Sequence, residues 1–190
     1  SANLRGCSRR TNAVMNLQQT LAHWRNQGLV DKPWFNGLWF QLTWFACVLG
    51  RDPWLPAIAA MFALHFLLVP SGVKEFKRIA PVAGAGIVTD AILTALGVFN
   101  FGDVFIPLWL IALWFAFATT LQRALAVFGR KLWIAALIGA VAVPLNYGAG
   151  AKMGAVDLPL GTGTTATSLI VVWFFLLPSL YRLAKHLGTK

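Results

Sequence analysis

The chain has 190 residues, of which 58% are hydrophobic and only 12% are charged. Soluble domains carry about 25% charged residues, so this composition excludes an ordinary water-soluble fold and indicates an integral membrane protein. A formal net charge of +10 would suggest a nucleic-acid partner in a soluble protein. Here the basic residues lie between long apolar runs, and we expect no nucleic-acid partner.

A polar leader of 33 residues precedes the first apolar run. Within it, Leu17, Leu21 and Trp24 share one face of a helix, and Gln, His and Arg side chains occupy the other. This pattern predicts a short amphipathic helix on the cytoplasmic leaflet, with a disordered leader as the alternative. The predicted division of the chain is therefore a cytoplasmic leader over 1–33 and a transmembrane domain over 34–187.

Six apolar runs follow, each close to the roughly 17–25 residues that a helix needs to cross the hydrocarbon core. Because lipid offers the backbone no hydrogen-bond partners, each run is expected to be a helix. The predicted fold is thus an all-α membrane protein with six transmembrane helices. These spans are Trp34–Gly50, Trp54–Ser71, Ile79–Asn100, Val104–Gln122, Leu132–Tyr147 and Thr167–Leu183. Residues 148–167, rich in Gly and Thr, are expected to form an extracytoplasmic loop.

The basic residues predict the orientation, because cytoplasmic loops carry an excess of Lys and Arg. Fourteen of the sixteen fall in the leader, the second and fourth connections or the tail. Only Arg51 and Lys152 fall on the opposite side. We therefore expect a multi-pass membrane protein with both termini in the cytoplasm.

One segment recurs in the sequence. "LWFQLTWFA" at 38–46 returns as "LWLIALWFA" at 108–116, with five of nine positions identical. The two copies would run in opposite directions across the membrane. This suggests a weak three-plus-three inverted repeat, a plan found in many transporters. Chance similarity between Leu-, Trp- and Phe-rich segments is the alternative.

Asp90 lies in the middle of the third predicted span, where a carboxyl group costs roughly 2.5–3.5 kcal/mol. At a rise of about 1.5 Å per residue, Thr43 lies at a similar depth. Gln41 lies a turn lower, and Thr167 and Ser168 lie slightly further out. We expect Asp90 to face the bundle and to hydrogen-bond to such groups. It would then be a neutral pin between helices, a group that binds a ligand or carries a proton, or a contact to a partner.

His65 in the second predicted span lies about 9 Å from the cytoplasmic end. Thr119 and Thr120 of the fourth span lie at that level. A satisfied core histidine is the plainest interpretation, and membership of a polar binding centre with Asp90, Gln41, Thr119 and Thr120 is the alternative. Glu75, among three bases at the cytoplasmic boundary, is predicted to form a surface ion pair.

The sequence carries none of several familiar catalytic motifs. Neither HExxH nor GxSxG occurs, and the chain has only six acidic residues. We therefore expect no catalytic residues, no cofactor and no metal ion, and an enzyme is the least favoured class.

Several segments resemble a known family, and "PLWLIALWFAFATTL" is the most specific of them. The others are "LWFQLTWFACVLGRD", "HF" at His65, Glu75, Asp90, "QRAL" and "VPLNYGAG". Over roughly residues 34–183 the chain is similar to the domain of unknown function 2878 family of small bacterial inner-membrane proteins. Members are often encoded near fatty-acid-modifying enzymes, such as cyclopropane-fatty-acid-synthase-like proteins. The resemblance therefore implies a lipid-related setting and supplies no catalytic residues.

Three hypotheses for function follow from these features. The first is a protein that binds or moves a lipid-like or apolar molecule through a polar centre around Asp90, with membrane lipids as partners. The second is an accessory subunit of a larger membrane protein complex. The third is an intramembrane enzyme that uses His65 or Asp90 as a base.

Overall fold

A computed structural model describes residues 14–16 and 18–188 of the chain. This part is mostly helical and contains no strand, apart from one isolated bridge between Asn100 and Asp157 that joins two loops. The predicted all-α class is confirmed for these residues.

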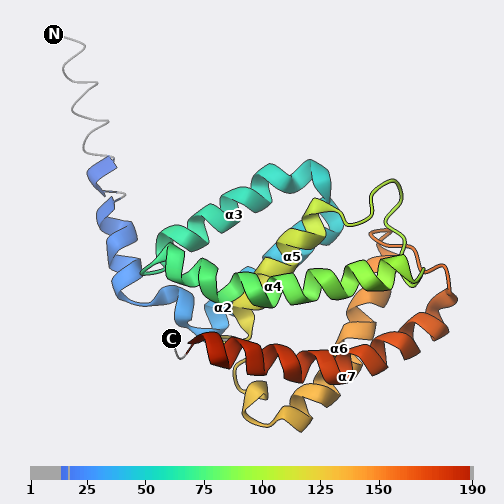
Figure 1. Ribbon diagram of the computed structural model, residues 1–190. Coiled ribbons are helices and arrows are strands. Elements are labelled where there is room, and N and C mark those ends of the chain that lie inside the picture. The colour runs from blue at the N-terminus through green and yellow to red at the C-terminus, as the bar shows by residue number, and fades with distance from the viewer. Residues whose placement is uncertain (1–13, 17, 189–190) are drawn as a thin grey trace.

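The bundle is built from α2 to α7, which Figure 1 shows packed against one another. The end of the bundle at the left holds the start of α2 and the C-terminal end of α7, and the loops around 96–107 and 153–160 lie at the right. The closest packing joins α6 to α7, α4 to both α5 and α7, and α2 to α5. The elements are η1 Leu29–Asp31, α2 Pro33–Phe45, the π-helical turn η2 Ala46–Gly50, η3 Asp52–Trp54, α3 Leu55–Leu68, α4 Gly72–Ala95, α5 Leu108–Thr120, η4 Phe128–Arg130, α6 Leu132–Lys152 and α7 Gly161–Gly188.

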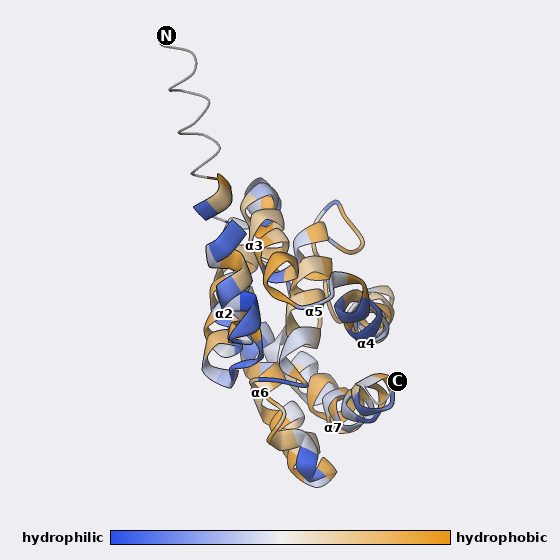
Figure 2. Cartoon of the chain, turned by 90° about the vertical axis from the view of Figure 1, so that its left-hand side faces the viewer, coloured by the Kyte–Doolittle hydropathy of each residue, from blue (hydrophilic) through white to orange (hydrophobic). Residues whose placement is uncertain are grey.

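Three helices, α4, α6 and α7, are long and apolar enough to cross a membrane, whereas α5 and the η3–α3 segment are shorter apolar helices. Large apolar side chains line the outside of the bundle. They include Leu38, Leu42, Phe45 and Leu49 on α2 and η2, Leu137, Val141 and Leu145 on α6, and Phe174 and Phe175 on α7. Figure 2 shows hydrophobic residues along the helix sides and hydrophilic ones at the near end, for instance at the start of α4. Such continuous apolar faces suit a lipid environment.

The helix α4 lies earlier in the chain than the predicted span Ile79–Asn100. It begins after Ser71, whose side chain caps the helix by accepting a hydrogen bond from the backbone N–H of Lys74 at 3.4 Å. It ends at Ala95, close to Gly97, which has a φ of 75°. Hydropathy alone missed both ends because a capping residue and a left-handed glycine, rather than polarity, set them.

The predicted loop over 148–167 is mostly helix. The helix α6 continues to Lys152 and α7 begins at Gly161, which leaves only residues 153–160 between them. Thr167 and Ser168 donate to the carbonyl oxygens of Gly163 and Thr164 in their own helix. Polar side chains that bond within the helix in this way do not end it.

Part of the predicted leader helix is present. Residues 18–26 are helical, while Leu17, one member of its apolar face, lies outside the described residues. Leu21 packs beside Val30, Leu68 and Val69. Arg25 donates two hydrogen bonds, at 2.6 and 3.1 Å, to the carbonyl oxygen of Leu67 near the C-terminal end of α3. A cation at a helix C-terminus is favourable, so this contact ties the leader to the bundle.

Candidate functional site

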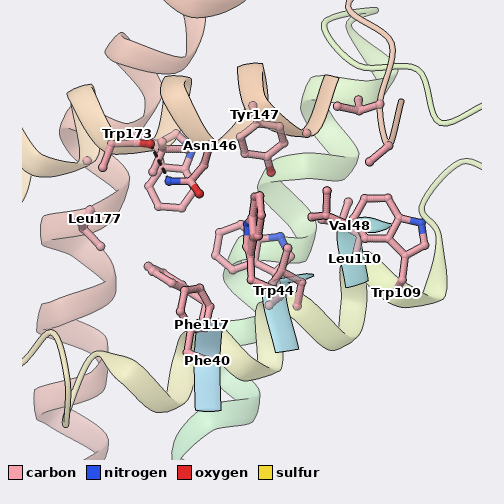
Figure 3. Close-up of a pocket in the computed structure, with 18 of the residues that line it drawn as sticks. Phe40, Trp44, Val48, Trp109, Leu110, Phe117, Asn146, Tyr147, Trp173 and Leu177 are labelled. Atoms are coloured by element: carbon pink, nitrogen blue, oxygen red, sulfur yellow. Dashed lines mark hydrogen bonds between the residues drawn. The ribbon is translucent and has the colours of Figure 1, made fainter. Parts of the chain in front are cut away.

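An aromatic cavity of about 280 Å³ lies between α2 and α5 on one side and α6 and α7 on the other. Figure 3 shows the aromatic side chains that surround this cavity. The aromatic members of its wall are Phe40, Trp44, Phe101, Trp109, Trp114, Phe117, Tyr147 and Trp173. Asn146, on the wall, donates to the carbonyl oxygen of Ala142 at 2.8 Å. The cavity is therefore suited to an apolar molecule, since nearly all of its wall is hydrocarbon.

Two of these tryptophans hold equivalent positions in the recurring nonapeptide. Trp44 comes seventh in the copy on α2, and Trp114 comes seventh in the copy on α5. Both line the cavity. The π-helical turn that begins at Ala46 follows directly, and Val48 within it also lines the cavity.

Asp90 is fully buried in α4 behind this wall. The indole Nε1 of Trp114 and the hydroxyl of Tyr147 each donate a hydrogen bond of 2.6 Å to its Oδ2 atom. Its Oδ1 atom has no hydrogen-bond partner within the described part of the chain. The carboxyl group thus joins α4 to α5 and α6. It does not line the cavity itself and would affect a bound molecule through Trp114 and Tyr147.

Stacking and close packing fix these two rings further. Tyr147 stacks on Phe99 with ring centroids 4.5 Å apart, and Trp114 stacks on Trp173 at 5.5 Å. The backbone of Gly86 approaches Trp114 so closely that a Cβ atom there would lie 2.1 Å from the indole ring. The aromatic wall is therefore held rigidly from behind, which is what a preformed binding site requires.

The hydrogen-bond partners of Asp90 differ from those predicted. Gln41 is exposed on α2 and lies outside the polar centre that we expected. Thr43 is buried but donates to the carbonyl oxygen of Trp39 at 2.8 Å, and Thr167 and Ser168 bond within α7 as described above. The sequence does not reveal Trp and Tyr as the donors, because aromatic residues in a membrane sequence are typical of packing or boundary positions. The extension of α6 past Tyr147 brings that residue to the depth of Asp90.

His65 belongs to a second, separate polar cluster, the ion cluster of Asp31, His65, Glu75 and Arg123. Arg123 donates two hydrogen bonds to Glu75, from Nη1 to Oε1 at 2.7 Å and from Nη2 to Oε2 at 3.0 Å. Its Nε atom donates to Asp31 at 2.9 Å. The Nε2 atom of His65 lies 3.2 Å from Glu75 Oε1. Glu75 is therefore not the surface residue that we predicted, because only 4% of it is exposed.

Two opposing effects act on the Arg123 guanidinium. Burial lowers its pKa, but hydrogen bonds and charge attraction from Glu75, and then from Asp31, outweigh burial and raise the pKa. Arg123 is thus a charged group held at the junction of η1, α3, α4 and α5.

Thr119 and Thr120 lie near this cluster rather than near Asp90. Asn36 donates to Thr119 Oγ1 at 3.1 Å and accepts from the backbone N–H of Ala124. The hydroxyl of Thr120 donates to the carbonyl oxygen of Phe117. The predicted centre is thus divided into two. Within residues 14–16 and 18–188, no three His, Cys, Asp or Glu side chains form a group that could hold a metal ion.

Comparison with known proteins gives a family and no described activity. No curated protein and no solved structure matches the chain. The family model described as "Protein of unknown function (DUF2878)" matches residues 33–179, which include α2 to α6, most of α7, Asp90 and the ion cluster except Asp31. The chain therefore belongs to the DUF2878 family.

Proposed function

We propose that the protein binds an apolar, lipid-like molecule in the aromatic cavity. The observation that carries the proposal is the cavity itself, about 280 Å³ with a wall of eight aromatic side chains and few polar atoms. Asp90 has a positioning role here: it orients Trp114 and Tyr147, which form part of the wall. Neither His65 nor Asp90 lines the cavity, so an intramembrane enzyme that uses one of them as a base receives little support.

The proposed setting is the bacterial inner membrane, crossed six times with both termini in the cytoplasm. Its support is the partition of basic residues, together with the two ends of the described chain lying at the same end of the bundle in Figure 1. In this arrangement the ion cluster lies near the cytoplasmic face, and the loops around 96–107 and 153–160 lie near the opposite face. Reporter fusions at Lys152 and at the C-terminus should report opposite compartments, and the same compartment at both points would refute six crossings.

A cavity-filling substitution tests the binding proposal. Ala142 lines the cavity, so Ala142→Phe should occupy it and reduce the amount of apolar compound that copurifies with the protein in mild detergent. Val141→Phe, next to it in α6 on the exposed face, is the matched control and should change nothing. Extraction and mass spectrometry would measure the bound compound. Equal amounts bound to the parent protein and to Ala142→Phe would refute binding in this cavity.

An accessory subunit of a membrane complex is the second candidate function. It is favoured by the exposed aromatic pair Phe174 and Phe175 on α7, which a partner helix could cover. A stoichiometric partner that comigrates with the parent protein, and is lost on Phe175→Ser, would support this function. Lipid contact alone predicts no such partner.

A further inference from the structure

A second, polar pocket of about 360 Å³ adjoins the aromatic cavity. It lies between η3, the loop 100–107 and residues 154–157. The two spaces share four wall residues, which are Phe101, Trp109, Ala155 and Val156. In Figure 3, Trp109 lies at the opposite end of the aromatic cavity from Leu177. The polar pocket therefore adjoins the aromatic cavity at its Trp109 end, with these four residues forming a common wall.

The charged side chains of the two spaces are all in the polar pocket. Arg51, Asp52 and Asp157 line it, and no charged residue lines the aromatic cavity. Arg51 donates from Nη2 to the carbonyl oxygen of Met153 at 2.9 Å, which holds its guanidinium beside residues 153–157. None of the ion pairs found among the described residues includes Arg51, Asp52 or Asp157.

The backbone at Arg51 is unusual. Its φ of 50° makes it the one non-glycine residue of the described chain in the left-handed region. Such conformations are costly for residues with a Cβ atom and cluster at ligand-binding and active sites. Arg51, the strained residue, is also the only basic residue that lines the polar pocket.

The signs of these charges restrict the ligand. A guanidinium group binds phosphate or carboxylate in a two-pronged geometry. A purely anionic group at Arg51 would also face the carboxylates of Asp52 and Asp157, which repel it. A purely cationic group could pair with the two carboxylates but would leave Arg51 without an anionic partner. A head group that carries one negative and one positive charge matches both signs.

Resting on the proposed function, we infer that the two pockets form one site for a single-chain amphiphile with a zwitterionic head group. The anionic part of the head pairs with Arg51 and its ammonium group with Asp52 and Asp157. The hydrocarbon chain passes Trp109 and fills the aromatic cavity. Arg51 is then a specificity residue at the extracytoplasmic end of the bundle, in the orientation proposed above.

Tryptophan quenching by brominated acyl chains provides the test, since four tryptophans line the aromatic cavity. The full chain in detergent would be titrated with three probes of equal chain length: brominated lysophosphatidylethanolamine, brominated lysophosphatidylglycerol and a brominated fatty alcohol. The quenching measured with Ala142→Phe is subtracted from that of the parent protein. The difference excludes quenching of exposed tryptophans by probe outside the cavity. The parent protein should bind the zwitterionic probe most tightly.

Two substitutions in the polar pocket are compared with a control. Arg51→Gln should weaken both phosphate-bearing probes about tenfold, because a charge-assisted pair is lost. Asp157→Asn should reduce the preference for the zwitterionic over the anionic probe about tenfold for the same reason. Lys152→Gln removes a base at the same end of the bundle that lines neither pocket, and it should change no affinity.

The outcomes separate the two proposals. If the three probes bind equally well to the parent protein and Arg51→Gln has no effect, the inference is overturned while binding in the aromatic cavity stands. If no probe gives quenching that Ala142→Phe removes, both are overturned. If Arg51→Gln does not fold, an unchanged head-group preference in Asp157→Asn overturns the inference.

Discussion

Removal of Glu75 should destabilise the protein strongly, because Glu75 forms a buried ion pair with Arg123. The side chain of Glu75 is 5% exposed and that of Arg123 is 10% exposed, so solvent screens their attraction little. Loss of one partner from a buried pair costs about 3–5 kcal/mol, because the other charge is left uncompensated. Asp31 still contacts Arg123, but its side chain is 58% exposed. We therefore expect Glu75→Leu to cost about 3 kcal/mol, at the lower end of this range.

A double-mutant cycle separates the pair from packing effects. Arg123→Leu alone leaves Glu75 buried beside His65 and should cost a similar amount. The double variant removes both charges, and replacement of a buried pair by apolar side chains is often nearly neutral. The double variant should therefore be more stable than either single variant. Asp31→Asn is the control at the exposed partner, where loss of a surface pair costs about 1 kcal/mol or less.

Cys47 provides the assay, because it is a fully buried free thiol. In a Cys7→Ser background it is the remaining one of the two cysteines, so its labelling by a thiol-reactive dye reports unfolding. For a chain of this size, about 3 kcal/mol corresponds to a fall in Tm of about 6–12 °C. If Glu75→Leu lowers Tm no more than Asp31→Asn does, the cluster is not the buried, coupled unit described above. A double variant less stable than both single variants would show that packing, and not charge, dominates.

The fold class could be predicted from the sequence. An apolar run of membrane length must satisfy its backbone hydrogen bonds internally, and a helix does so. The ends of the helices could not be predicted, since capping determines them. Ser71 starts α4 about seven residues before the hydropathy maximum suggests, and this shift places Glu75 inside the bundle instead of on its surface. A carboxylate that looks peripheral by hydropathy thus becomes the centre of a buried ion cluster.

Of the candidate site, Asp90 could be identified from the sequence but its hydrogen-bond partners could not. Asp90 stood out because a carboxyl group is costly at mid-membrane, and the structure shows it buried between helices. The sequence favours Thr and Gln as partners of Asp90, because the polarity of these residues is evident. The partners are Trp114 and Tyr147, whose single polar atoms are small against their apolar rings. Depth along a helix was not enough to find them, because direction around the helix also decides which side chains meet.

Two further substitutions test how the aromatic wall is held. Asp90→Leu should cost about 2–5 kcal/mol of stability, because it leaves the buried donors of Trp114 and Tyr147 unsatisfied. Asp90→Asn keeps an acceptor and should cost about 1 kcal/mol in the same thiol assay. Equal stability of Asp90→Leu and the parent protein would refute the role of Asp90 in holding the two rings. Gly86→Ala tests the wall without touching a polar group. Its Cβ atom would lie 2.1 Å from the Trp114 indole, whereas a Cβ atom at Gly84 would meet nothing within 4 Å. Gly86→Ala must therefore displace Trp114 from Asp90 and from its stack on Trp173. It should lower both Tm and the quenching by a brominated alcohol, while Gly84→Ala changes neither. If Gly86→Ala lowers Tm but leaves quenching at the parent level, the position of Trp114 is a packing requirement alone and the cavity does not depend on Asp90.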